Sequence, residues 1–520
     1  MSVEGHEALE LMGEEPVGDV LSTEDLTEAA AEGLRWIAYA RIAIELALLG
    51  SMVVLARLIP PQAFGVFAVV VIVQELALTL PMEGIGGALV QRKSVSRNHL
   101  QGGLALSLAV SACLVLVTVV LSIVLIEPLF GGETETLMLA NTPYFLLGAV
   151  YAVPMALLRR RLDFRRMSLI EVAMNATRAL VTLGLAFAGF NAPALVFGAM
   201  AGMAVAVLLA LVFAPVPLPW WHRKEARELL PYGGPAAAAT IAWAGFRNGD
   251  YAVIGATLGQ AAAGIYWRAY QLAVEYQRKV AVAMTQMAFP VLARTAGEDE
   301  LLALRQRMVQ LLTVVLFPLL AVLFVVAPVL VPWMFGPEWS EAVVPTQILV
   351  VGGAATLVID ACGSSLMAVG NTRALLGYGI AHFVVYVGVV LAVAHLGLPA
   401  VAIGGAVVHT AFLGVAYIVL LRDRVPNPLR VLWQDVEPAL VSLLGLAALA
   451  VPVNLMLEGA GAAPLPQMTA TALAAGLGYL LVLRIGFPAA ARDLAAAVRR
   501  ILPDRLTARL PERRTALAES

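Results

Sequence analysis

Charged and polar side chains inside long apolar runs are the residues of this sequence that could do chemistry. The stretch GFRNGDYAVIG places Arg247, Asn248 and Asp250 within an apolar run that begins near residue 233. Arg247 and Asp250 are three residues apart, so a helix would carry both on one face. A guanidinium group binds phosphate oxygens through paired hydrogen bonds. A carboxyl group in a low-dielectric site can take up and release a proton.

The same types of side chain recur in other apolar runs. The candidates for binding an anionic substrate group are Arg41, Arg247, Asn248, Arg268, Arg278 and Lys279. The candidates for proton coupling are Glu45, Glu75, Asp250 and Glu275. A basic residue that faced lipid would cost about 2.5–3.5 kcal/mol, so these side chains predict a polar cavity between helices. Two alternatives stay open: ion pairs that only fix helix register, and an interface anchor in the case of Arg268.

Composition defines the environment in which these groups act. Hydrophobic residues make up 60% of the 520 residues and charged residues 13%, whereas soluble proteins carry about 25% charged residues. The apolar runs are continuous, and each is long enough to cross a bilayer core of about 30 Å. The sequence therefore predicts an all-α polytopic membrane protein. The single cysteines Cys113 and Cys362 indicate no disulfide or metal framework, and no cofactor is expected.

About fourteen transmembrane helices are predicted. They lie near residues 35–57, 66–90, 100–126, 137–158, 169–188, 194–214, 233–258, 263–289, 308–333, 342–369, 374–395, 399–421, 437–457 and 468–486. Alternate connections are rich in Lys and Arg, as in RRRLDFRR, whereas the connections between them, such as EPLFGGETE, contain none. Basic residues accumulate on the cytoplasmic side, so both termini are expected to be cytoplasmic.

An internal repeat divides the predicted helices into two halves. LARLIPPQAFGVFAV resembles IGATLGQAAAGIYWRAY, and the glycines Gly65 and Gly264 take equivalent places in the two stretches. Six helices per half give a parallel repeat, hence two pseudo-symmetric six-helix lobes plus two extra helices. The expected organisation is an acidic tail (1–34), an N-lobe (35–231), a C-lobe (232–421), two extra helices (422–486) and a basic tail (487–520).

The second predicted helix carries sequence motifs typical of one family. The stretch LARLIPPQAFGVFAVVVIVQELALTLPMEGIGGALVQRKSVSRNHLQG resembles the opening of bacterial polysaccharide-transport flippases of the O-antigen and exopolysaccharide (Wzx) type. These flippases belong to the multidrug/oligosaccharidyl-lipid/polysaccharide exporter superfamily. The matching positions are Pro61, Phe64, Gly65, Gly84, Gly86, Gln91 and Arg92, with Ile59 where the family usually has Leu. The resemblance covers roughly residues 36–424.

The resemblance implies a flippase of the bacterial inner membrane. Its substrate would be an undecaprenyl-pyrophosphate-linked oligosaccharide repeat unit, moved between leaflets by alternating access for exopolysaccharide, O-antigen, lipopolysaccharide or capsule biosynthesis. The partners implied are the lipid bilayer, a polysaccharide polymerase and export machinery, with proton or sodium coupling and no nucleic acid. The motifs transfer no substrate-binding residue to this sequence.

The sequence also bears on two other classes of function. A cation-coupled drug antiporter of the same superfamily would favour a mainly acidic cavity, which the deep basic residues disfavour. A membrane enzyme of polysaccharide assembly would need a sizeable outward catalytic loop, and the outward connections are short, so the chain is expected not to be an enzyme. His382 and His409 could relay protons, although a lone histidine on an apolar helix is more often a packed residue.

A helix hinge is predicted within the second span. The segment TLPMEGIGGALV combines Pro81 with several glycines around Glu83. Proline removes a backbone hydrogen bond and glycine loosens the helix, so a kink or hinge is expected in this segment. The alternative is that these residues only allow close helix packing.

Overall fold

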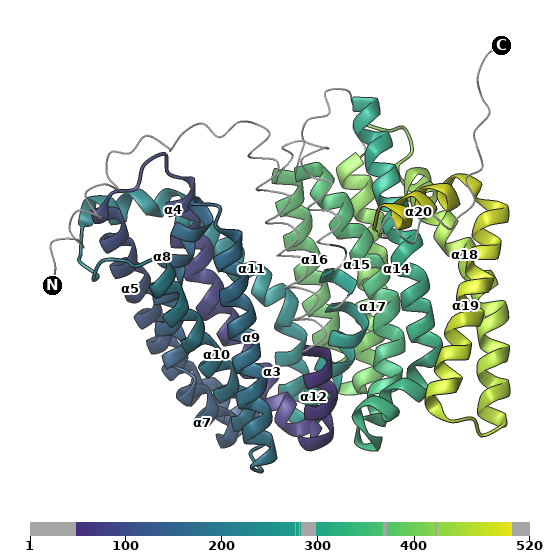
Figure 1. Ribbon diagram of the computed structural model, residues 1–520, viewed down its shortest axis with the longest axis horizontal. Coiled ribbons are helices and arrows are strands. Elements are labelled where there is room, and N and C mark those ends of the chain that lie inside the picture. Colours follow the sequence, from purple (N-terminus) through teal and green to yellow (C-terminus); the bar gives the residue numbers. More distant parts are fainter. Residues whose placement is uncertain are drawn as a thin grey trace. The chain divides into compact units, whose positions relative to one another are not determined.

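The computed structural model describes residues 48–275, 277–279, 281, 298–367, 372–421 and 424–501 of the 520-residue chain. Within these ranges all the regular elements are helices. The chain divides into two compact units, Met1–Trp267 (unit 1) and Arg268–Ser520 (unit 2) (Figure 1). The boundary falls inside one helix, between Trp267 and Arg268. The lobe boundaries expected from the repeat stay a prediction.

Unit 1 is a bundle of long helices that enclose one apolar core. Its elements are α3 (Pro61–Thr79), η1 (Leu80–Gly86), α4 (Gly87–Gln91), α5 (Arg97–Leu121), η2 (Ser122–Ile126), α6 (Glu127–Phe130), α7 (Gly132–Ala140), α8 (Pro143–Arg160), α9 (Phe164–Phe187), α10 (Ala192–Phe213), α11 (Arg223–Leu258) and the start of α12 (Gln260–Tyr270). Helices α3 and α8 begin with proline, which the first turn of a helix tolerates. Phe145, Leu158 and Met203 lie in the core.

Unit 2 contains the remaining helices. Its elements are the end of α12, η3 (Gln271–Glu275), α14 (Glu298–Phe335), η4 (Pro337–Ala342), α15 (Val343–Met367), α16 (Thr372–Val393), η5 (Ala394–Leu396), α17 (Leu398–Leu421), α18 (Pro428–Gly459), α19 (Pro464–Gly486) and α20 (Pro488–Ile501). The last two long helices, α18 and α19, pack against each other, and both contact α14. Trp339 and Tyr417 are its largest fully buried side chains.

The predicted fold class is confirmed. Eleven helices in the described ranges are long and apolar enough to cross a membrane. The predicted spans near 35–57, 233–258 and 263–289 are not among them, and each includes residues or side chains outside the described part of the chain. The chain is therefore a multi-pass helical membrane protein, and the count of fourteen stays a prediction.

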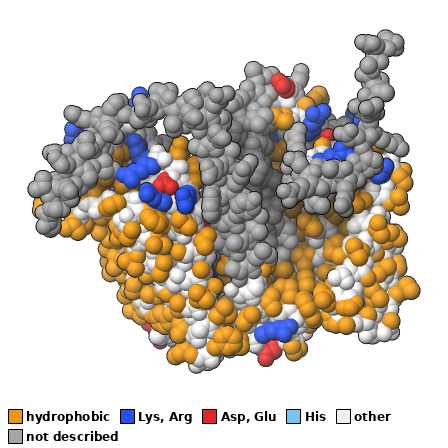
Figure 2. Space-filling model, viewed as in Figure 1, with side chains coloured by type: hydrophobic (Ala, Val, Ile, Leu, Met, Phe, Trp, Pro, Cys, Tyr) orange, Lys and Arg blue, Asp and Glu red, His pale blue; other side chains and the backbone are white. Residues whose placement is uncertain are grey.

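The connections at the two ends of unit 1 make different polar contacts. At one end, Arg160 at the end of α8 donates to the carbonyl of Leu89 at 2.9 Å, and Arg92 after α4 pairs with Glu228 of α11 at 2.5 Å. At the other end, Gln260 donates to Thr134 at 2.6 Å. Figure 2 shows basic side chains gathered at one end of unit 1, above a broad hydrophobic surface. This separation is expected of a bilayer protein; which end is cytoplasmic stays a prediction.

The segment around Pro81, where a kink or hinge is predicted, forms a π-helix. The element η1 covers Leu80–Gly86 between α3 and α4. A Cβ added to Gly86 would lie 3.3 Å from the carbonyl oxygen of Ala152, and one added to Gly84 would lie 3.4 Å from that of Gly233. The glycines therefore allow neighbouring helices to approach closely, as the alternative predicted, and a hinge at this segment stays a prediction.

Candidate functional site

The sequence-predicted site residues are described to different extents. Side chains are described for Glu75, Asp250, Arg268, Glu275, Arg278 and Lys279. Arg41 and Glu45 lie outside the described residues, and Arg247 and Asn248 lie in α11 at positions whose side chains are outside the description. Roles for these four residues remain predictions.

Two predicted coupling residues lie on different helices of unit 1. Asp250 on α11 is 1% exposed, and one of its carboxylate oxygens accepts a hydrogen bond from the backbone N–H of Tyr251 at 2.9 Å. Glu75 on α3 is half-buried. Its neighbour Gln74 is buried and donates to the side-chain oxygen of Asn141 at 2.8 Å. Both carboxyl groups thus lie among helices rather than on an exposed loop.

Arg268 occupies an aromatic site in unit 2. Its guanidinium carbon lies 5.5 Å from the ring centroid of Phe335 and 5.5 Å from that of Trp339. Arg268 also donates to the side-chain oxygen of Gln271 at 3.4 Å, and its exposed fraction is 3%. Aromatic faces attract a guanidinium group, so this side chain is held by protein contacts in the described conformation. A substrate phosphate would have to displace these contacts.

The structure brings Glu275 and Arg278 together. One guanidinium nitrogen of Arg278 donates to both carboxylate oxygens of Glu275 at 2.9 Å. Asp360 on α15 is also attracted to Arg278, and the half-buried Lys279 follows in sequence. One predicted anion-binding residue and one predicted coupling residue of unit 2 therefore form an ion pair. Substrate binding by Arg278 or Lys279 stays a prediction.

A buried ionic group that the sequence did not reveal joins three helices of unit 2. Arg305 on α14 donates to Asp435 on α18 at 2.8 Å, and the hydroxyl of Tyr417 on α17 donates to the same carboxylate oxygen at 2.5 Å. The side chains of Arg305 and Asp435 are 3% and 0% exposed. Arg305 lies between the predicted spans 263–289 and 308–333, and no spacing rule links it to a residue 130 positions later. We call these three residues the α14–α18 triad.

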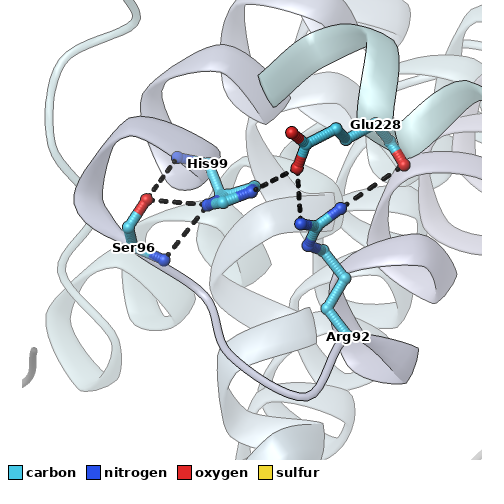
Figure 3. A network of polar contacts seen from close by, with 4 residues as sticks. All are labelled: Arg92, Ser96, His99 and Glu228. Atoms are coloured by element: carbon cyan, nitrogen blue, oxygen red, sulfur yellow. Dashed lines mark hydrogen bonds and ion pairs between the residues drawn. The ribbon is translucent and has the colours of Figure 1, made fainter. Parts of the chain in front are cut away.

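A second polar group lies at the basic end of unit 1 (Figure 3). Glu228 of α11 pairs with Arg92 at 2.5 Å and with His99 of α5 at 3.2 Å. The hydrogen bond from His99 and that from Arg92 lower the pKa of Glu228 below its usual value. His99 also lies 2.7 Å from the Ser96 hydroxyl. We call these four residues the α5–α11 network; the described structure has it partly exposed to solvent.

The cations near this network line an open hollow. Arg223, Lys224 and Arg227 surround a space of about 560 Å³ on the first turns of α11, beside Glu228. Trp220 and Trp221, which precede α11, are 68% and 53% exposed. Exposed tryptophan and basic residues are typical of a membrane–water interface. This end of unit 1 therefore matches the depth at which lipid headgroups lie. Among the described residues, no group of three or more His, Cys, Asp or Glu side chains is arranged to hold a metal ion.

Comparison with solved structures defines the class of this fold. The structure is similar to that of the lipid II flippase MurJ in an inward closed conformation, with a TM-score of 0.72, 13% identity, and coverage of 88% of this chain and 99% of that chain. It is also similar to an inward-facing multidrug resistance MATE family transporter of the MOP superfamily, with a TM-score of 0.55, 17% identity, and coverage of 75% and 95%. At these identities the similarity shows a shared fold.

Sequence comparison defines the family. A family model described as polysaccharide biosynthesis protein matches residues 54–344, which is more than half of the chain. A relative from Escherichia coli (strain K12), the lipopolysaccharide biosynthesis protein WzxC, is 28% identical over 352 residues, covering 66% of this chain and 70% of that protein. The chain belongs to this polysaccharide biosynthesis protein family, as the resemblance of its motifs to Wzx-type flippases predicted.

Proposed function

We propose that this protein is a flippase for lipid-linked oligosaccharides of polysaccharide biosynthesis. The observation that carries the proposal is the family match over residues 54–344 in a chain with eleven described candidate spans. The name of the E. coli relative and the flippase fold of MurJ support it. The substrate is an undecaprenyl-pyrophosphate-linked repeat unit, transferred across the bacterial inner membrane with both termini cytoplasmic.

Alternating access is the proposed mechanism, and a reciprocal contact of the two sequence repeats supports it. A Cβ added to Gly65 would overlap the carbonyl of Gln260, and a Cβ added to Gly264 would overlap the carbonyl of Pro61. Gly65 and Gly264 are equivalent in the repeat, and so are Pro61 and Gln260. Helices α3 and α12 thus begin against each other, backbone to backbone. In the proposed cycle these helix starts separate when the substrate path opens at that end.

The intramembrane charges supply the polar part of the substrate path. Arg41, Arg247, Asn248, Arg268, Arg278 and Lys279 are proposed to contact the pyrophosphate and sugar, with Glu45, Glu75, Asp250 and Glu275 as coupling groups. The oligosaccharide passes between the helices while the polyprenyl chain stays in lipid. A drug antiporter remains the second candidate, favoured by the similarity to the MATE transporter.

A reconstituted transport assay tests the proposal. Proteoliposomes of the full chain should move an undecaprenyl-pyrophosphate-linked oligosaccharide between leaflets, measured by its accessibility to an added glycosidase. Gly264→Ala should slow transfer strongly, because its Cβ meets a backbone carbonyl that cannot move alone. Gly184→Ala is the control, since no atom lies within 4 Å of its added Cβ. Export of cationic drugs without lipid transfer would favour the antiporter and defeat the proposal.

A further inference from the structure

Two histidines of neighbouring helices in unit 2 meet inside the apolar part of the fold. Nε2 of His382 on α16 lies 2.9 Å from Nδ1 of His409 on α17. Their rings are nearly perpendicular, with an interplanar angle of 86°. Both residues lie within candidate membrane spans, Gly377–Leu396 and Leu398–Val419. His409 is near the middle of its span, so the pair lies far from the ends of the helix.

The geometry of the pair limits it to one extra proton. A nitrogen–nitrogen separation of 2.9 Å is that of a hydrogen bond, in which one ring nitrogen donates and the other accepts. The accepting nitrogen must carry no proton. The bond therefore persists when the pair is neutral or holds one added proton, and it is lost when both rings are charged. A single added proton also makes the bond charge-assisted and stronger.

Aromatic rings enclose the pair. Phe412 stacks on His382 with ring centroids 4.5 Å apart, and Tyr386 stacks on His409 at 4.9 Å. Tyr378 lies at 5.7 Å from His382 and donates its hydroxyl to the carbonyl of Phe412. Aromatic faces stabilise a cation by their negative potential. The rings thus offer a charged imidazole a favourable contact within the membrane.

Several ionisable groups of the surrounding helices have interactions of their own. On α15 to α18 the described ionisable side chains, apart from the pair itself, are Asp360 on α15, Tyr378 and Tyr386 on α16, Tyr417 on α17, and Arg430, Asp435, Glu437 and Glu458 on α18. Asp360 interacts with Arg278, and Tyr417 and Asp435 belong to the α14–α18 triad. On its α15 side the pair meets Gly352, whose added Cβ would lie 3.5 Å from a ring carbon of His409. The close approach of this glycine places the imidazole of His409 beside the backbone of α15.

We propose that His382 and His409 form a single proton-binding site that couples lipid transfer to a proton gradient. The inference rests on the proposed function. In each cycle the pair takes one proton from water on one side of the membrane, holds it between the two rings, and releases it to water on the other side. The ligand of the site is the proton itself, and the pair is separate from the coupling carboxylates predicted from the sequence.

Proton binding is tested directly on the full chain in nanodiscs by ¹⁵N NMR of labelled histidine between about pH 5 and 9. The signals of His382 and His409 should respond together to the uptake of one proton, and His382→Gln should change the response of His409. His395→Gln is the matched control, because His395 is exposed at the end of α16 in η5. Rings that do not titrate, or that titrate independently of each other, would overturn the site.

Coupling is tested in proteoliposomes with undecaprenyl-pyrophosphate-linked oligosaccharide as the probe. For one proton per lipid, a gradient of one pH unit should shift the leaflet distribution about tenfold. His382→Gln and His409→Gln should abolish this shift, and His395→Gln should keep it. A wild-type protein that transfers lipid without responding to the gradient overturns the coupling. A wild-type protein that transfers no lipid refutes the proposed function, and the NMR titration then decides the proton site alone.

Discussion

The two compact units use the same ionic chemistry in opposite surroundings. In the α5–α11 network of unit 1, the side chains of Arg92 and Glu228 are 28% and 34% exposed. In the α14–α18 triad of unit 2, those of Arg305 and Asp435 are 3% and 0% exposed. Water can solvate the first pair when it opens, so the pair adds little stability. Water cannot solvate the buried second pair in the same way. Loss of either Arg305 or Asp435 therefore leaves the other charge buried without its partner. Burial, rather than the bond itself, decides what each pair contributes.

The largest effect is expected from removing the buried carboxylate. Asp435→Ala leaves the guanidinium of Arg305 without this counter-charge, and loss of one member of a buried pair costs about 3–5 kcal/mol. Thermal unfolding of the purified protein in detergent should show a markedly lower midpoint. Glu458→Ala on the same helix, at an exposed position, should leave the midpoint almost unchanged. Equal shifts in the two variants would contradict the comparison.

A smaller loss of stability is expected from removing the Tyr417 hydroxyl of the α14–α18 triad. Tyr417→Phe removes the donor to Asp435 but keeps the ring beside Arg305, whose guanidinium carbon lies 5.4 Å from the ring centroid. Hydrogen bonds to charged groups contribute about 1.5–3 kcal/mol. In a double-mutant cycle with Asp435→Ala, the two losses should not add, because they share one interaction. Additive losses would show that the hydroxyl acts through another partner.

The smallest effect is expected at the exposed network. Glu228→Gln removes a carboxylate whose pKa is lowered by His99 and Arg92. A carboxylate with a lowered pKa stabilises the folded state above its usual pKa, and this contribution disappears as the pH falls through the lowered value. The small difference from wild type should therefore vanish in acid and shrink in about 1 M salt. Glu225→Gln, in the first turn of the same helix, is the control. A stability difference between Glu228→Gln and wild type that persists in about 1 M salt would show that this network behaves like a buried ion pair.

Much of the fold follows from the sequence because the bilayer constrains it strongly. Apolar runs must form helices in lipid, and this rule predicted the all-helical class that the structure shows. The alternation of connections rich in Lys and Arg with connections that contain none predicted that Arg92 and Arg160 would lie at the same end of the helices. In unit 1, Arg92 donates to the backbone carbonyl of Glu228, and Arg160 donates to that of Leu89, three residues before Arg92. The boundary between the two compact units was harder to predict from the sequence. It falls inside α12, and the composition of that helix does not change at the boundary.

The candidate site could be predicted only where partners are local. The pairing of Glu275 with Arg278 follows from a spacing of three residues. The contact of Arg268 with Phe335 and Trp339 could not be predicted, because it depends on how α12 packs against the end of α14 and against η4. The same holds for His382 and His409, which the sequence presented as two lone histidines and the fold brings to 2.9 Å.

The π-helix η1 sets the rotational phase of everything that follows it in the second span. A π turn holds about one residue more than an α turn, and η1 accounts for seven residues directly before α4. If the same residues wound as an uninterrupted α-helix, they would advance the helix by about one more residue's rotation. The side chains beyond them would then turn by about 100° about the axis. Arg92 would point away from Glu228, so the wider π winding inside the membrane aligns an ion pair at its surface.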